Sequence, residues 1–95
     1  MKGVFEMSET NKKTAIELKY PVTIDGTEVS VLHMRRPKVR DQLLMDKAGK
    51  VGKSEGEREV LLFANLCEIA PESLEGVDMS DYRKLQEAYT SFLEG

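Results

Sequence analysis

The hydrophobic residues are densest between residues 57 and 70, where the sequence reads EREVLLFANLCEIA. A helix here would be apolar around most of its circumference, which is typical of a helix buried on more than one side. Ser54 followed by Glu57 predicts a capping box at its start, and Pro71 cannot continue it. We therefore expect a central helix over 57–70, with an apolar surface of Val60, Leu62, Phe63, Ala64, Leu66, Cys67 and Ala70 and a polar wedge of Arg58, Asn65 and Glu68.

Hydrophobic residues alternate with polar ones before this segment, from Ala15 to His33. Asp25-Gly26 interrupts the alternation and predicts a two-residue type I′ turn, hence a β-hairpin. Such a turn would pair Ile24 with Thr27, Val22 with Val29, Tyr20 with Val31 and Leu18 with His33. Pro21 cannot donate to a β-ladder, so its strand is an edge or is bulged there. Leu32 and Met34 fall on the opposite face, which indicates a bulge or a second covered surface.

Helical spacing returns on both sides of the central segment. Pro37 suits the first position of a helix that Gly49 would end, with Val39, Leu43, Leu44 and Ala48 at helical spacing. The glycine-rich stretch 49–56 predicts a flexible connection. After Pro71 we expect a single turn with Leu74 inward and Gly76 at its end. The last helix should begin near Ser80, preceded by Asp78, with the acidic Asp81 favourable to the helix dipole. It should carry one apolar stripe of Tyr82, Leu85, Tyr89, Phe92 and Leu93.

The element order is therefore β-β-α-α-α, which predicts an α+β fold with helices packed on one face of a small antiparallel sheet. Residues 1–14 are polar and without periodicity, so we expect them to form a disordered N-terminal tail. Residues 15–95 should form a single domain, since 95 residues allow only one small core.

Charge is distributed unevenly along the chain. Residues 1–53 hold eleven Lys/Arg against seven Asp/Glu, and residues 54–95 hold three against ten, which together give the net charge of −3. Such asymmetry can indicate head-to-tail self-association or a basic surface for an acidic partner. The alternative is that folding brings the two halves together and their charges partly neutralise.

No stretch suggests catalysis, a cofactor or a metal site. The single histidine, His33, has no Cys or His at ligand spacing, and Cys67 has no partner in the chain, which suits a buried, unreactive thiol in a reducing cytoplasm. Gly52-Lys53-Ser54 lacks the earlier glycine of a phosphate loop, because Lys47 stands at that position. No apolar run approaches the roughly 20 residues that a membrane-spanning helix needs.

Two segments remain as candidate interaction sites. Arg35 to Arg40 contains four cations in six residues and could grip phosphates, although no aromatic residue interleaves them and the chain is acidic overall. The apolar stripe of Tyr82, Leu85, Tyr89, Phe92 and Leu93 could bind a partner helix. Its alternative role is packing on the central helix, which we favour for Leu85 and Tyr89.

Two blocks of sequence resemble the small tail assembly chaperones of Mu-like and related contractile-tailed phages. The first runs from Leu18 through Pro21-Val-Thr-Ile and Arg35-Arg36-Pro37 to Asp41-Gln-Leu43. The second, more distinctive block runs from Glu59 through Leu62-Phe-Ala-Asn-Leu66 and Pro71-Glu-Ser-Leu74 to Asp78-Met-Ser-Asp81-Tyr82 and Leu85-Gln86. Together they cover most of residues 15–93.

The resemblance implies a non-enzymatic role without a cofactor. Proteins of this kind bind the long tape-measure protein and keep it soluble until tail-tube subunits polymerise around it. The resemblance therefore implies a phage or prophage protein in the cytoplasm of the bacterial host, absent from the mature virion, with the tape-measure protein as partner and the tail-tube protein as a further candidate. The resemblance does not assign the binding surface to particular residues. The competing hypotheses are a DNA-binding phage regulator that uses Arg35 to Arg40 and a structural tail component.

Overall fold

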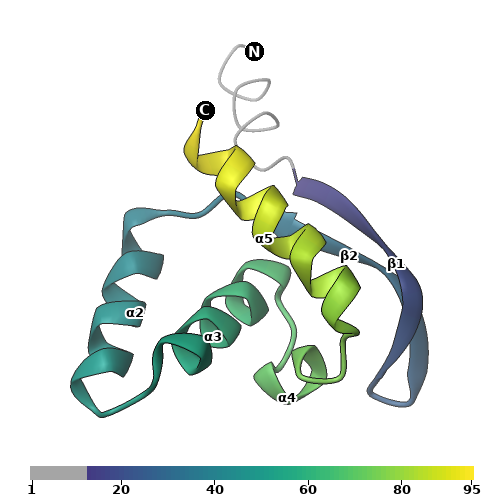
Figure 1. Cartoon of the computed structure of the whole chain (residues 1–95), viewed down its shortest axis with the longest axis horizontal. Helices are drawn as coiled ribbons and strands as arrows, with labels where there is room; N and C mark the ends of the chain where they lie inside the picture. The colour runs from purple at the N-terminus through teal and green to yellow at the C-terminus, as the bar shows by residue number, and fades with distance from the viewer. Residues whose placement is uncertain (1–12) are drawn as a thin grey trace, which may run out of the picture.

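The computed structural model describes residues 13–95, which form a β-hairpin followed by four helical segments (Figure 1). Strands β1 (Lys13–Ile24) and β2 (Thr27–Arg35) pair antiparallel. The helices are α2 (Val39–Lys50), α3 (Glu55–Cys67), the single turn α4 (Pro71–Leu74) and α5 (Met79–Leu93). The α+β class and the predicted element order are confirmed. Lys13 and Thr14 belong to β1, and the rest of the predicted tail lies outside the described residues.

The hairpin turn forms as its sequence predicts. Asp25 and Gly26 have φ angles of 51° and 80°, the positive values that a type I′ turn requires. Val22 pairs with Val29 and Ile24 with Thr27, as expected.

Beyond these pairs the register shifts, so the predicted pairing of Tyr20 with Val31 and of Leu18 with His33 is wrong. Val31 lies opposite Glu17, and His33 lies opposite Ala15. Residues 18–21 of β1 therefore face Ser30 alone, as a bulge at the position where Pro21 suggested one. The bulge restores Leu32 and Met34 to the covered face, where they are 3% and 0% exposed.

Helix α3 is the centre of the core. Ser54 Oγ accepts a hydrogen bond from the Glu57 amide, and the Glu57 carboxylate accepts one from the Ser54 amide, which confirms the capping box. The helix ends at Cys67, earlier than predicted, because Glu68 adopts a left-handed conformation with φ of 60°. Ala70 caps α4 and is exposed rather than part of the apolar surface. The buried core joins the hairpin to the helices through Ile16, Leu18, Val22, Leu32, Met34, Leu62, Phe63, Ala64, Leu66, Cys67, Leu74, Val77 and Leu85.

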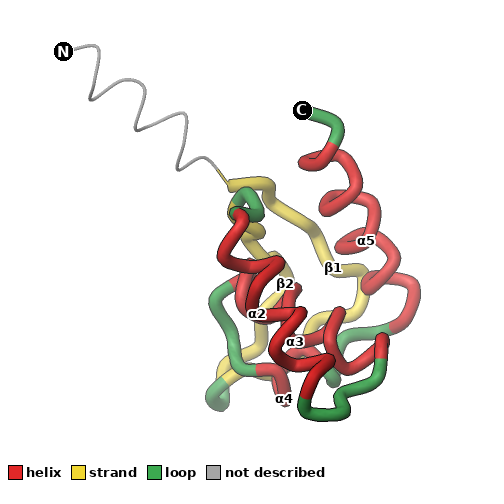
Figure 2. The backbone as a smooth tube through the Cα atoms, turned by 90° about the vertical axis from the view of Figure 1, so that its left-hand side faces the viewer, coloured by secondary structure: helices red, strands yellow, loops and turns green. Residues whose placement is uncertain are grey.

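The two flanking helices cover different parts of this core. Helix α5 runs along β1 in the opposite direction, so its C-terminal end lies near the start of β1 (Figure 2). Asp78 caps α5 by accepting a hydrogen bond from the Ser80 amide, as expected. Helix α2 packs on α3, on the side away from α4 (Figure 1).

Helix α2 differs from the expectation in its bounds and in its exposure. It begins at Val39 rather than Pro37 and continues past Gly49 to Lys50. It buries Asp41 and Ala48, whereas Val39, Leu43 and Leu44 are 78%, 55% and 40% exposed. These three residues lie at helical spacing, but the side of the helix that faces α3 carries a buried carboxylate instead.

Candidate interaction surfaces

The predicted stripe of α5 mostly contributes to the core. Leu85 is fully buried, and the rings of Tyr82 and Tyr89 lie 5.6 and 5.5 Å from the ring of Phe63. Phe92 is half-buried, with the Arg36 guanidinium 5.2 Å from its ring centre. Leu93 is 63% exposed. Of the five residues of the predicted stripe, Leu93 is exposed and the other four pack in or against the core.

Leu93 lies at the edge of a hollow between α2 and α5, which we call the α2–α5 hollow. Its volume is about 260 Å³, and Tyr89, Leu62 and Met45 contribute apolar side chains to its lining. Val39 and Leu93, both largely exposed, border it. An apolar depression with exposed apolar edges can accept hydrophobic side chains of a partner. The hollow brings Tyr89 and Leu93 of the predicted stripe together with α2, which sequence reasoning did not anticipate.

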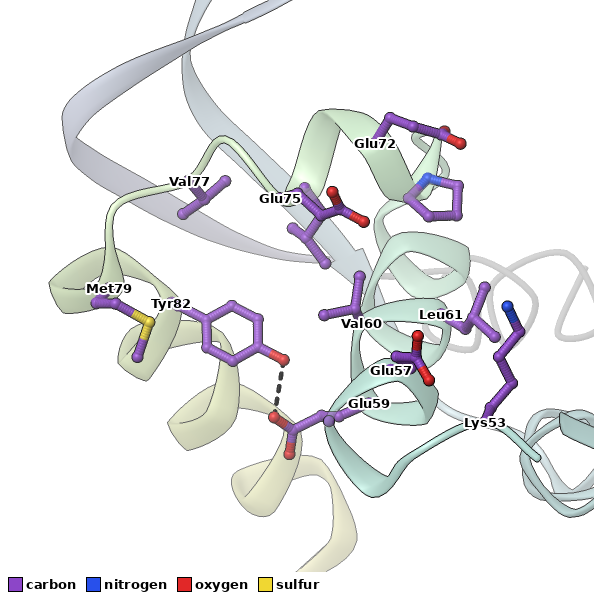
Figure 3. Close-up of a pocket in the computed structure, with 13 residues that line it drawn as sticks. Lys53, Glu57, Glu59, Val60, Leu61, Glu72, Glu75, Val77, Met79 and Tyr82 are labelled. Atoms are coloured by element: carbon purple, nitrogen blue, oxygen red, sulfur yellow. Dashed lines mark hydrogen bonds between the residues drawn. The ribbon is translucent and has the colours of Figure 1, made fainter. Parts of the chain in front are cut away.

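A larger depression of about 590 Å³ lies between α3, α4 and the start of α5, and we call it the acidic groove (Figure 3). Apolar side chains of Val60, Leu61, Pro71, Leu74, Val77, Met79 and Tyr82 contribute to its lining. Four glutamates and one lysine also line the groove: Glu57, Glu59, Glu72, Glu75 and Lys53. Figure 3 shows the Tyr82 hydroxyl donating to Glu59, at 2.7 Å. Burial, followed by this bond to Glu59, raises the pKa of the Tyr82 hydroxyl, so it stays protonated.

Two buried carboxylates hold the elements that frame these surfaces. Asp41 accepts two hydrogen bonds from the Arg35 guanidinium, at 2.9 and 3.0 Å, one from the Lys38 amide and one from the Asn65 side chain. These bonds hold the pKa of Asp41 below its usual value despite burial, and the bonds from Arg35 contribute most. The same pairing raises the pKa of Arg35. Asp41 therefore fixes the start of α2 against β2 and α3.

Asp81 does the same for α5 and β1. Its carboxylate accepts hydrogen bonds from the Lys19 and Tyr20 amides, both at 3.0 Å, in the bulge of β1. These two bonds lower the pKa of Asp81, with Lys84 at 3.2 Å adding to the effect. We predicted Asp81 only as an acidic residue favourable to the helix dipole. A bulge at Pro21 leaves amides of the strand unpaired. This was the sequence signal that an acceptor such as Asp81 had to lie nearby.

The basic stretch is largely occupied within the chain. Arg35 pairs with Asp41, and the Arg36 guanidinium donates to the Phe92 carbonyl oxygen at 3.3 Å. Lys38 and Arg40 remain exposed. Two of the four cations are thus engaged within the chain, which leaves Lys38 and Arg40 for contacts with phosphates of a nucleic acid.

Residues 13–95 show no group of three metal-binding side chains. In the same residues, no helix combines the length and the apolar character needed to cross a membrane. Cys67 is buried, and burial raises the pKa of its thiol to about 11. Residues 13–95 therefore form a small α+β domain whose surface carries the apolar α2–α5 hollow and the acidic groove.

Comparison with protein families identifies the family to which this domain belongs. The model described as "phage tail assembly chaperone proteins, E, or 41 or 14" matches residues 15–94. The chain belongs to this family of phage tail assembly chaperones, a family that is generally without enzymatic activity. Comparison with curated proteins and with solved structures finds no match.

Proposed function

We propose that this protein binds the tape-measure protein of its phage or prophage and keeps it soluble while the tail is assembled. The observation that carries the proposal is membership of the tail assembly chaperone family over residues 15–94. The protein would act in the host cytoplasm and would be absent from the finished particle.

We place the client on the α2–α5 hollow. Val39 and Leu93 are 78% and 63% exposed at the edges of an apolar depression, so they extend its lining into a patch that a partner can cover. A client helix could insert its apolar residues between them, with Tyr89 and Met45 lining the hollow beneath. The protein's net charge of −3 would help keep the complex dispersed.

Co-expression with the tape-measure protein tests this proposal. We expect the tape-measure protein to be soluble with the wild-type chain and insoluble without it. The double variant Val39→Asp/Leu93→Asp should stay folded and lose this effect, because two carboxylates would have to be desolvated in the interface.

Thr23→Asp/Ser91→Asp serves as the matched control, since it adds the same charge at exposed positions outside the hollow. It should solubilise the client like the wild type. A tape-measure protein whose solubility does not depend on this chain would refute the proposed function. Equal activity of the hollow variant and the control would refute the placement alone.

A further inference from the structure

A third depression lies where the end of α2 meets the start of α3, the two helices being joined by a short loop (Figure 1), and we call it the basic hollow. Its volume is about 430 Å³. Three cations and one carboxylate line it around a glycine: Lys50, Lys53, Arg58, Asp46 and Gly49. The carboxylate of Asp46 accepts a hydrogen bond from the Gln42 side chain. The lining is therefore positive, in a chain whose net charge is −3.

The Arg58 guanidinium has no acceptor among residues 13–95. The three ion pairs within that range do not include Arg58, and its Nε atom is buried without a hydrogen-bond partner. A guanidinium presents five N–H donors, and buried donors in folded proteins are almost always paired. Because Arg58 lines the basic hollow, an anion in the hollow can supply the acceptor.

The alternative role for Arg58 is to cap the last carbonyl groups of α2, as arginines near a helix C-terminus often do. Three of these carbonyl oxygens, those of residues 47–49, already accept backbone amides of residues 51–53, at 3.1 to 3.3 Å. The end of α2 is thus closed by its own backbone, which leaves the charge of Arg58 for the hollow.

Gly49 allows Arg58 to lie close against α2. A Cβ atom at residue 49 would be 2.9 Å from Nη1 of Arg58 and 3.5 Å from its Cδ. The φ angle of Gly49 is not positive, so its backbone conformation does not itself require glycine. Glycine also lowers the stability of a helix relative to alanine. The close approach of the guanidinium therefore accounts for a glycine at this position.

We infer that the basic hollow binds a phosphate group. A guanidinium can donate two parallel hydrogen bonds to phosphate oxygens while an ammonium neutralises further charge, and Arg58 and Lys50 supply these two groups. Lys53 adds positive charge but also borders the acidic groove, where it acts on Glu57. The basic hollow and the α2–α5 hollow share no lining residue, so the inference goes beyond client binding and does not rest on it.

Titration with inorganic phosphate at constant ionic strength, followed by nuclear magnetic resonance, tests the site. We expect saturable shifts of the Arg58 Nε–H signal and of the Gly49 amide signal. Lys50→Gln/Arg58→Gln should weaken phosphate binding by about tenfold or more, because it removes both charge-assisted donors. Acetate at the same concentration should bind more weakly, because its single charge and two oxygens engage fewer of the donors.

Gly49→Ala tests the geometry. The added Cβ should displace the end of the Arg58 side chain and weaken phosphate binding, while urea denaturation shows a fold at least as stable as the wild type. A loss of affinity without a loss of stability is a result that a purely structural role for Arg58 does not produce. Unchanged affinity in Gly49→Ala would overturn the proposed geometry.

Lys19→Gln/Arg83→Gln is the matched control, with the same change in net charge at exposed positions outside the hollow. It should bind phosphate like the wild type, and circular dichroism checks that every variant is folded. A wild-type protein without saturable shifts, a control as weak as Lys50→Gln/Arg58→Gln, or acetate binding as tight as that of phosphate would overturn the inference.

A short single-stranded oligonucleotide identifies the source of the phosphate. Oligonucleotide binding that Lys50→Gln/Arg58→Gln abolishes would support the site and assign it to the backbone of a nucleic acid. Binding of inorganic phosphate without binding of the oligonucleotide would support the site and assign it to a small phosphate compound.

Discussion

Asp41 and Asp81 are the two residues on which the arrangement of the helices depends most directly. Both are buried, at 2% and 0% exposure, and both collect hydrogen bonds from backbone amides and charged side chains. A buried carboxylate is stable only when such partners replace water. Each one ties a helix N-terminus to the hairpin, α2 through Arg35 and α5 through the β1 bulge.

Replacement of Asp41 should destabilise the protein severely. Asp41→Ala leaves the Arg35 guanidinium and the Lys38 amide without their acceptor, and removal of one partner of a buried pair costs about 3 kcal/mol. Urea denaturation followed by circular dichroism would measure this loss. Asp46→Ala, an exposed carboxylate on the same helix, should change the unfolding free energy by less than about 0.5 kcal/mol.

The same two carboxylates predict how stability depends on pH. Their pKa values are lowered in the folded state, so each stabilises the fold above the unfolded pKa of about 4. This stabilisation is lost as pH falls below about 4, through the folded pKa values. The contribution of these groups to stability should therefore not change with pH near neutrality and should fall in acid.

Asp81→Asn separates the contribution of Asp81. The variant should be less stable than the wild type at pH 7, and the difference in unfolding free energy should narrow as pH falls below about 4. Asp78→Asn is the control, because asparagine caps a helix as well as aspartate does. A constant difference between Asp81→Asn and wild type across the acid range would contradict the assignment.

At the level of elements, α5 combines a core face with an exposed end. Leu85 is fully buried near its middle, and Leu93 is 63% exposed at its C-terminus. Tyr82 and Tyr89 lie on either side of Leu85 against Phe63, and Glu59 joins α5 to α3 by accepting hydrogen bonds from Tyr82 and Gln86. The helix is therefore anchored over its first three turns and presents its last residues to the α2–α5 hollow.

One substitution at two positions of α5 distinguishes these roles. Leu85→Ala should lower the unfolding free energy by about 2–5 kcal/mol, because it opens a cavity in the core. Leu93→Ala should change it by less than about 1 kcal/mol, because its side chain is largely in water already. Thermal and urea denaturation of the two variants would measure both values, and similar losses would show that Leu93 packs against the core.

For the whole molecule, one small core carries the stability of all its parts. Cys67 lies in that core at 8% exposure, between the hairpin and the helices. Its thiol is almost covered in the folded state, and burial raises its pKa from 9.0 to about 11. The cysteine thus serves as a probe of opening.

We expect the native protein to react with a thiol reagent at pH 7 at least about a hundredfold more slowly than the protein unfolded in urea. The raised pKa alone lowers the thiolate fraction by about this factor, and restricted access adds to it. The unfolded protein supplies the control rate. Leu85→Ala, which weakens the core, should accelerate the reaction, whereas Leu93→Ala should leave it unchanged.

Local sequence signals were sufficient to predict the secondary-structure elements. The Asp25-Gly26 turn, the Ser54–Glu57 capping box, the Asp78 cap and the buried face of Leu62, Phe63 and Leu66 all form as predicted. Each depends on residues within a few positions of one another, so the sequence alone determines them. The family resemblance, carried by residues quoted from both blocks, was likewise visible without a structure and is confirmed over residues 15–94.

Only the tertiary structure decided which contacts the elements make with one another. The pairing of Glu17 with Val31, the capture of the bulge amides by Asp81 and the exposure of Val39, Leu43 and Leu44 join residues far apart in the chain or depend on such contacts. Periodicity identifies which residues share a helix face, but not whether a neighbour covers that face. The buried Asp41 orients α2 so that Val39, Leu43 and Leu44 are exposed while Ala48 packs inward. The two depressions exist only because four helical segments converge on one core.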